Sequence, residues 1–227
     1  MDFKGDIFAG RTTGYLAEQL IRISRIPEAN FSYLTSMSET IRSFIAVELP
    51  DDVLSAVSRV QEQLKSYGFR TKWVRPANIH ITLKFFGDIE SGMIDAIAGA
   101  MASAVEGCNP ISLAAKGIGV FPNIERPRVL WAGLSGEVNL LIDLQQKLDD
   151  WLSDIGFARE RRSFKGHLTL GRFKARVNSA EIMRALTEFK GFETQAFMVR
   201  DIILFKSELR PSGAVYSKLA GISFGHK

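Results

Sequence analysis

This chain of 227 residues has few cysteines, few histidines and no long apolar run, and each scarcity excludes a class of protein. Cys108 is the only cysteine, so the chain can form no internal disulfide, which fits a reducing compartment and predicts a cytoplasmic protein. No apolar run approaches the roughly 18 residues of a membrane-spanning helix. The first residues, MDFKGDIFAGRTTGY, lack the apolar stretch of a secretory signal. We therefore expect no membrane partner.

Several common catalytic motifs are also missing. The segment AGLSGEV lacks the Gly-x-Ser-x-Gly elbow of serine hydrolases, and no glycine-rich phosphate loop of the Walker type occurs. Metal ligation is disfavoured because histidine ligands usually come with other ligands at short spacing, and only Asp88 follows a histidine segment closely. The sequence therefore predicts no metal and no cofactor.

Basic residues cluster in one segment of the chain. Hydrophobic residues make up 46% and charged residues 24%, as in ordinary globular proteins, and the net charge is only +4. The excess is nevertheless concentrated in ARERRSFKGHLTLGRFKAR, residues 158–176, around His167. Such a run is usually a solvated face, but it also suits an anionic ligand.

Strand and helix patterns alternate from residue 41 onward. Residues 1–40 are irregular, and we treat them as an extension of unknown role. The first half predicts a strand over 43–49, a helix from Asp51, a strand over 78–86, a helix capped by Ser91, and a hairpin of 111–121 with 128–134. The second half predicts a helix over 138–155, a strand over 167–173, a helix from Ser179, a strand over 196–205 and a last strand over 214–220.

The two halves have the same order of elements, which indicates an internal repeat. We predict repeat units of about 41–121 and 128–206 within one bilobal domain, residues 41–221, followed by a tail, 222–227. Two of the three histidines lie in these units, one on the middle strand of each, in the matching frames HITL and HLTL. The third, His226, lies in the tail, and we expect it to be solvated.

The two frames place the same polar pair on one face of each strand. Because side chains alternate along a strand, His80 and Thr82 share a face, as do His167 and Thr169. Two such strands about a pseudo-twofold axis would bring two imidazoles and two hydroxyls to one point. One imidazole can then act as a general base and the other as a general acid in phosphoester cleavage, with the threonines donating to phosphoryl oxygens.

Two cations near the frames are further candidates for phosphate binding. Regular alternation puts Lys84 on the face of His80. It puts Arg172 on the opposite face from His167, but the preceding Gly171 would permit a bulge that turns the arginine back.

Two interpretations without catalysis stay open at this stage. A lone His-x-Thr is most often a satisfied histidine on a half-buried strand, and common descent of the two halves could preserve the frame without chemistry. A noncatalytic RNA-binding module could also use the basic run and exposed aromatic side chains to hold phosphates and bases.

The chain resembles the two-histidine (2H) phosphoesterases, and within them the LigT-like RNA 2′,3′-cyclic phosphodiesterases, also called 2′-5′ RNA ligases. The segments that carry the resemblance are RSFIAVELP, KWVRPANIHITLKFFGD, GIGVFPNIERPRVLWAGL, SFKGHLTLGRFK and KSELRPSGAVYSKL. They extend over residues 41–221, all but the extension and the tail. The chain departs from the family in SFKGH, where a proline often precedes the histidine.

The resemblance implies an α+β fold: a bilobal pseudo-twofold duplication in which two antiparallel sheets line a central cleft and helices lie outside. It implies metal-independent hydrolysis of RNA 2′,3′-cyclic phosphates to 2′-phosphates by a monomer, with a weak reverse ligation. Carried onto this chain, His80 is the general acid and His167 the general base, although these roles could be exchanged. Thr82, Thr169 and Arg172 bind the phosphate. Another cyclic phosphate or a 2′-5′ linked oligonucleotide remains an alternative substrate, because the frames recognise only the phosphate.

Overall fold

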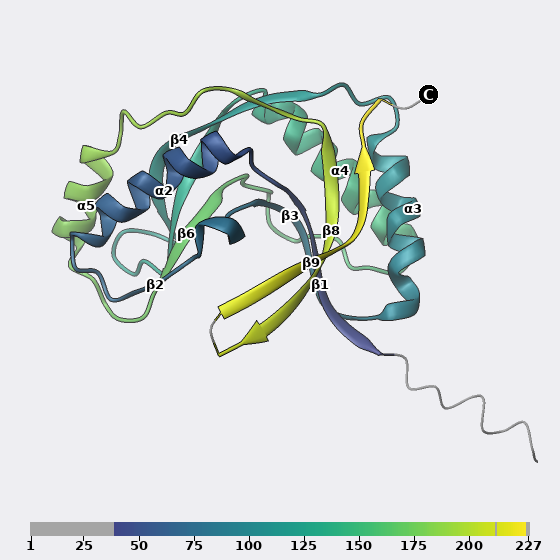
Figure 1. The fold of residues 1–227 in the computed structure, drawn as a ribbon, viewed down its shortest axis with the longest axis horizontal. Helices are drawn as coiled ribbons and strands as arrows, with labels where there is room; N and C mark the ends of the chain where they lie inside the picture. The colour runs from purple at the N-terminus through teal and green to yellow at the C-terminus, as the bar shows by residue number, and fades with distance from the viewer. Residues whose placement is uncertain (1–38, 212, 226–227) are drawn as a thin grey trace, which may run out of the picture. The chain divides into compact units, whose positions relative to one another are not determined.

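The computed structural model describes residues 39–211 and 213–225 of the chain. Figure 1 shows a curled sheet with helices on its outer side. The strands are β1 (Thr40–Val47), β2 (Thr71–Trp73), β3 (Ile81–Glu90), β4 (Ile111–Phe121), β5 (Val129–Gly136), β6 (Leu168–Phe173), β7 (Phe197–Val199), β8 (Asp201–Arg210) and β9 (Gly213–Ser223). The helices are α2 (Asp51–Lys65), α3 (Ile94–Val105), α4 (Val138–Asp154) and α5 (Ser179–Glu188), with short 3₁₀ turns η2 (Pro76–Asn78) and η3 (Ser91–Met93).

The helices form where apolar residues recur every three or four positions. In α2 the buried apolar residues are Val53, Val57, Val60 and Leu64, which makes one face of the helix apolar. The predicted cap at Ser91 is wrong, because this residue begins η3 and α3 starts at Ile94 without a side-chain cap.

The strands form one ladder that divides into two four-stranded halves. Its order is β7-β4-β5-β6-β3-β1-β8-β9, and β2 adds to the edge of β6. The two halves join only where β6 meets β3, at the pair Ile81 and Leu168. All registered pairs are antiparallel. The predicted α+β class with antiparallel strands is therefore confirmed, and the two expected sheets are the two halves of one continuous ladder.

Two strands that follow one another in the sequence, β7 and β8, lie in different halves of the ladder, which makes one sequence prediction wrong. Residues 196–205 were expected to form a single strand. Instead the chain breaks at Arg200, and β7 pairs with β4 in one half while β8 pairs with β1 in the other. The apolar run shows no boundary because buried residues occur on both sides of the break, including Phe197, Val199 and Ile202.

The ends of the ladder also differ from the prediction. The pattern did not reveal the short strand β2, and β9 continues to Ser223, two residues into the expected tail. Strand β1 begins at Thr40, the last residue of the expected extension. The other extension residues up to 38 lie outside the described residues, as does His226.

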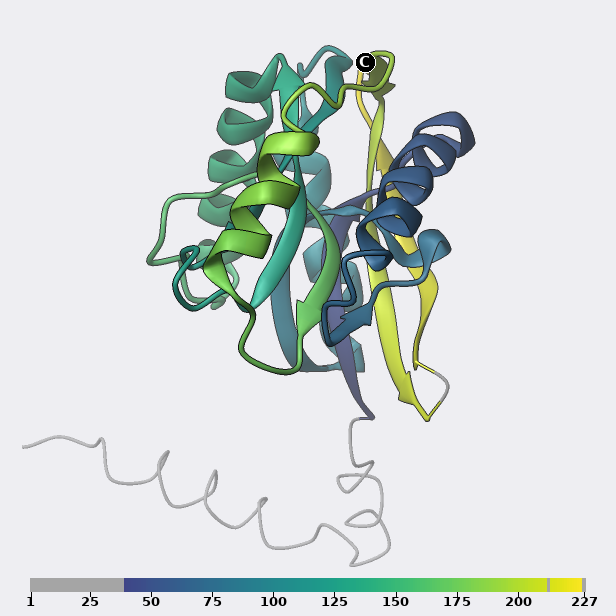
Figure 2. The same cartoon turned by 90° about the vertical axis from the view of Figure 1, so that its left-hand side faces the viewer.

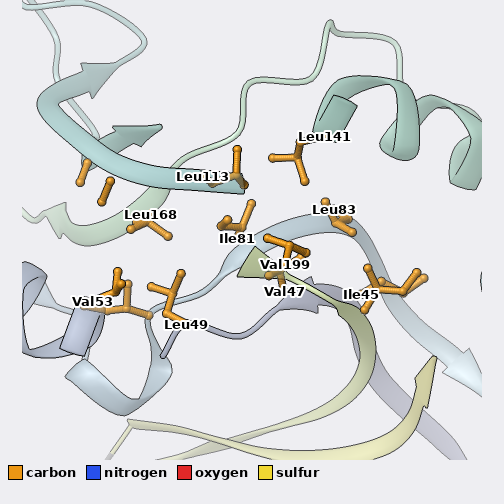
Figure 3. Packing of buried hydrophobic residues seen from close by; sticks show 14 of the residues in the cluster. Ile45, Val47, Leu49, Val53, Ile81, Leu83, Leu113, Leu141, Leu168 and Val199 are labelled. Atoms are coloured by element: carbon orange, nitrogen blue, oxygen red, sulfur yellow. The ribbon is translucent and has the colours of Figure 1, made fainter. Parts of the chain in front are cut away.

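Helices α2 and α5 cover one half of the ladder and α3 and α4 the other, as Figures 1 and 2 show. One large apolar cluster, of which Figure 3 shows a part, extends beneath all four helices. Ile81 and Leu168, where the halves join, are fully buried within it. A smaller apolar cluster lies apart from it, formed by Phe44, Ala46, Ile203 and Phe205 with Tyr216 beside them. Among the described residues, no helix has both the length and the apolar character to span a bilayer.

Candidate active site

The two histidines immediately precede β3 and β6 and make the same backbone contact. His80 Nδ1 lies 2.8 Å from the carbonyl oxygen of Asn78, and His167 Nδ1 lies 2.6 Å from that of Lys165. A carbonyl only accepts, so each Nδ1 carries a proton and donates it. Each neutral imidazole therefore has its lone pair on Nε2, which is the form that accepts a proton from water.

The two frames face one another across the junction of the halves. Ile81 in β3 pairs with Leu168 in β6. In this antiparallel register the positions on either side of that pair are His80 with Thr169 and Thr82 with His167. Each histidine is therefore opposite the threonine of the other frame. Directly opposed side chains in such a ladder have Cβ atoms about 5 Å apart. The sequence prediction of two imidazoles and two hydroxyls around one point is compatible with this register.

A cleft of about 520 Å³ opens beside the frames. His80, Thr82, Thr169 and Arg172 all line it. Half of the remaining lining residues are basic or aromatic, namely Arg42, Phe44, Lys72, Trp73, Arg75, Phe85 and Tyr216, and they come from β1, β2, β3, β9 and the start of η2. Such a surface suits a ligand that combines a phosphate with an aromatic base.

Both middle strands bulge at the same position of the frame. Leu83 in β3 and Leu170 in β6 each fall at a register shift, where they have no partner across the ladder to the neighbouring strand. After a bulge the alternation of side chains is shifted by one residue. For this reason Arg172 lines the cleft, as does Phe85, which holds the same place in the first frame. The bulge expected at Gly171 lies one residue earlier, at Leu170.

The same bulge makes the prediction for Lys84 wrong. Its ammonium points away from the cleft into the protein, where Nζ lies 2.5 Å from Asp149 Oδ1 in α4 and 2.7 Å from the carbonyl oxygen of Ala158. Glu160 Oε1 is 3.6 Å away. Only 5% of the Lys84 side chain is exposed, so this residue is a structural cation and does not reach the phosphate site.

A buried glutamine of α2 holds the second bulge. Gln61 Nε2 donates to the carbonyl oxygen of Leu170, 2.9 Å away, and to that of Val74, 2.8 Å away. The Val74 amide donates to the same Leu170 carbonyl at 2.9 Å. A Cβ on Gly171 would lie 2.5 Å from Thr71 Cγ2 of β2, so glycine is required where β2 crosses.

His80 lies among aromatic rings. Its imidazole stacks on Phe44, with ring centroids 4.8 Å apart, and meets the edge of Tyr216 at 5.5 Å. Burial in these surroundings lowers the pKa of His80 to about 4, opposed by the hydrogen bond to Asn78 and assisted by the nearby His167. Burial likewise raises the pKa of Tyr216, so its phenol stays a neutral donor.

His167 has a different setting. It meets Phe121 edge-on at 5.1 Å and Trp131 at 6.4 Å. The Trp131 ring crosses Gly119 so closely that a Cβ there would lie 2.2 Å from it. Burial lowers the pKa of His167, against the hydrogen bond to Lys165, and the positive charge of Arg172 lowers it further. Both imidazoles are therefore neutral near pH 7 in the free protein.

Several residues of the cleft escaped the sequence reasoning. Arg42 and Tyr216 come from strands at a distance in sequence, and Lys72 lies in the short strand β2, directly opposite Arg172. Phe85 could have been found by comparing the frames position by position, because it follows His80 by the same five residues that separate Arg172 from His167.

These features define a class of site: one neutral imidazole and two hydroxyls line a basic cleft, and a second neutral imidazole, His167, precedes the neighbouring strand β6, on two repeated β-α-β units. Among the described residues, no three metal-ligating side chains converge. The model of the LigT-like phosphoesterase family matches residues 47–131 and 134–216, one segment for each repeat. The chain belongs to this family, as the sequence resemblance predicted.

Curated relatives agree with this assignment. A protein of Methanothermobacter thermautotrophicus is 36% identical over 179 residues, which cover 79% of this chain and 96% of the relative. One of Methanocaldococcus jannaschii is 33% identical over 176 residues, covering 78% of this chain and 96% of the relative. Both relatives are named RNA 2′,3′-cyclic phosphodiesterase.

Solved structures show the same fold. The protein TT0787 of Thermus thermophilus superposes with a TM-score of 0.68 at 26% identity, covering 81% of this chain and 98% of that one. The apo form of E. coli LigT superposes with a TM-score of 0.65 at 20% identity, covering 83% of this chain and all of the other.

Proposed function

We propose that this chain hydrolyses RNA 2′,3′-cyclic phosphate ends to 2′-phosphates without a metal and as a monomer. The observation that carries the proposal is the matched pair of imidazoles, each with Nδ1 bonded to a backbone carbonyl and Nε2 left for chemistry. The names of the relatives supply the substrate class. The basic and aromatic cleft supports a nucleotide as ligand.

In the proposed reaction two proton transfers accompany one displacement at phosphorus. His167 Nε2 takes a proton from water while the water oxygen attacks phosphorus. The bond from phosphorus to O3′ breaks, and O3′ receives a proton from Nε2 of protonated His80. The products are a 2′-phosphate and a free 3′-hydroxyl. Solvent then returns the proton from His167 to His80, which restores the starting state.

This division of roles follows the family resemblance; burial lowers the pKa of His80 to about 4, so His80 becomes an acid only after the phosphate anion has bound. Arg172 disfavours a positive charge on His167 in the free protein, which suits a base. His80 has aromatic neighbours, and His167 is the one ionisable group among the causes of its lowered pKa. An arriving phosphate anion therefore raises the pKa of His80 and supplies the protonated acid.

The phosphate is held by the remaining frame residues. Thr82 and Thr169 donate hydrogen bonds to the non-bridging oxygens, and Arg172 adds a charged planar donor. All three line the cleft with His80. Loss of one such donor typically slows an enzyme by about 10²-fold or more.

Product analysis tests the proposal. The purified protein should convert RNA ending in a 2′,3′-cyclic phosphate to RNA ending in a 2′-phosphate, at an unchanged rate in EDTA. Release of a 3′-phosphate, or a requirement for divalent metal, would contradict the mechanism. If the protein binds RNA but never opens the ring, the noncatalytic RNA-binding module becomes the better account.

The roles of the two histidines can be separated by the leaving group. His80→Ala should lose far less activity on a nitrophenyl phosphodiester, whose leaving oxygen needs no proton, than on the cyclic phosphate. His167→Ala should lose activity by the same factor on both substrates. The reverse pattern would exchange the acid and the base. Parallel assays on other cyclic phosphates and on 2′-5′ linked oligonucleotides decide the natural substrate.

A further inference from the structure

A second pocket, also of about 520 Å³, lies next to the cleft. One wall is the stretch of β3 that follows its bulge, and the other is the segment 157–162 that leads out of α4. Strand β6 pairs with β3 only at Ile81 and therefore leaves this part of β3 uncovered on that side. The pocket is lined by Lys84, Phe85, Phe86, Phe157, Ala158, Arg159, Glu160, Arg161 and Arg162.

Two arginines of this pocket have no carboxylate to neutralise them. Lys84 is held by Asp149, and Arg159 pairs with Asp150 of α4. Arg161 and Arg162, by contrast, form no ion pair with any residue in 39–211 or 213–225. Both are exposed. They leave two positive charges available to an anion at this place.

The segment that carries these arginines is anchored to β3. The Asp149 carboxylate bonds Lys84 Nζ through one oxygen and accepts from the Glu160 amide, 2.8 Å away, through the other. The Lys84 ammonium also donates to the Ala158 carbonyl. Phe157 packs on Phe86 with ring centroids 4.7 Å apart. The arginines therefore extend from a segment that is fixed to β3 and α4 by backbone hydrogen bonds and by side-chain packing.

Phe85 joins this pocket to the cleft, because it lines both. Its ring is 48% exposed, an unusual state for a phenylalanine in a strand. The Arg42 guanidinium lies 4.7 Å from the ring centroid. An exposed ring between two basic pockets is the arrangement on which a nucleic-acid base stacks, and such stacking is worth about 1–3 kcal/mol per base.

We propose that this pocket is a second nucleotide subsite, which binds the nucleotide on the 5′ side of the cyclic-phosphate nucleotide. The proposal rests on the proposed function, since the cyclic phosphate must occupy the cleft. An RNA 3′ end can extend from the cleft only toward its 5′ side. Its penultimate base stacks on Phe85, and the adjoining phosphodiester meets Arg161 and Arg162. The preferred substrate is then an RNA strand rather than a free nucleotide.

The test compares a 2′,3′-cyclic mononucleotide with a trinucleotide that has the same cyclic end. In wild-type protein kcat/KM should be higher for the trinucleotide. Arg161→Ala/Arg162→Ala should lower kcat/KM for the trinucleotide about tenfold and change it less than about twofold for the mononucleotide. Phe85→Ala should also reduce the trinucleotide advantage. The matched control, Lys147→Ala/Lys190→Ala, removes the same charge from exposed positions outside both pockets.

The outcomes separate this proposal from the proposed function. Equal losses on both substrates would mean that the segment supports the fold near His167, and no loss on either would mean that the pocket binds nothing; both overturn the subsite. If wild-type protein opened neither ring, the proposed function would fail. The subsite would then be judged by trinucleotide binding. The double arginine variant, which loses its contact with one phosphate, should lower the slope of log Kd against log salt by about 0.7, and an unchanged slope would overturn the subsite.

Discussion

Each imidazole of the cleft has its tautomer assigned by a backbone carbonyl two residues earlier in the chain. This contact also fixes the ring orientation, so Nε2 is available without a change of side-chain rotamer. The remaining difference between His80 and His167 is electrostatic. Burial is the largest cause of the lowered pKa of both; the positive charge of Arg172 adds to it at His167, and His167 adds to it at His80.

The lowered histidine pKa values predict an acidic pH optimum for kcat/KM. In the free protein the productive form needs one imidazole protonated and the other neutral, and both pKa values lie below 6.5. The bell-shaped profile of kcat/KM should therefore centre below pH 6.5 and fall as the pH rises above it. The profile of kcat should be displaced to higher pH, because the bound phosphate anion raises the pKa of the acid. Steady-state kinetics between pH 4 and 9 checks this, and a kcat/KM that rises steadily through pH 8 would disprove it.

Among the elements, the two bulges decide which side chains reach the cleft. Each is tied to a helix of the other repeat unit by a buried polar group: Gln61 of α2 bonds the β6 bulge, and Asp149 of α4 bonds Lys84, next to the β3 bulge. A bulge leaves backbone groups outside the ladder, and buried groups of this kind need a partner. The Gln61 amide gives the Leu170 carbonyl a side-chain partner and so holds the bulge after which Arg172 lines the cleft.

Gln61→Leu should therefore impair both stability and catalysis. The Val74 carbonyl would lose its side-chain donor and the Leu170 carbonyl one of two, at a cost of about 1–3 kcal/mol in the free energy of unfolding. A less well held bulge should also lower kcat more than it raises KM. Urea unfolding and steady-state kinetics measure both effects. Gln145→Leu in α4 is the matched control, since Gln145 is also buried but its side chain bonds no described residue. Equal behaviour of the two variants would refute the role of Gln61.

Helices and strands could be predicted from the sequence far better than the two bulges. Apolar periodicity predicted the four helices of residues 39–211, and the paired frames predicted that the two strands carrying the histidine frames lie together. A bulge adds one residue without altering composition, so regular alternation assigned Lys84 to the wrong face and left Arg172 undecided. A buried lysine is also invisible to hydropathy, because its partner Asp149 lies 65 residues away. Comparing the frames directly would have helped, since Lys84 corresponds to Gly171 and Phe85 to Arg172.

At the scale of the whole molecule, the two repeats depend on each other. The two halves of the ladder join at one residue pair, and β4 and β8 each pair with strands of the other repeat, which places part of each repeat in the other's half of the ladder. The buried pair of Lys84 and Asp149 adds a polar link, with side-chain exposures of 5% and 12%. Neither repeat can then form a complete sheet alone.

Breaking that ion pair should destabilise the whole domain. Asp149→Ala leaves the Lys84 ammonium buried without its main partner and should cost about 3–5 kcal/mol in the free energy of unfolding. Adding Lys84→Met to this variant should recover much of the loss, because the uncompensated charge is gone. Urea denaturation of the two single variants and the double variant measures the coupling. Single-variant losses below about 1 kcal/mol would show that the pair is unimportant.

The central claim is that the two repeats supply one acid and one base to the same phosphate. Its most direct test is the single-turnover rate of ring opening, on cyclic-phosphate RNA in EDTA, for wild-type protein, His80→Ala, His167→Ala and the double variant. We expect each single variant to be about 10²–10⁴-fold slower than wild type, and the double variant to be at most about tenfold slower than the slower single variant, because residues that act as a unit are not additive. A correctly folded single variant that opens the ring at the wild-type rate would contradict the account.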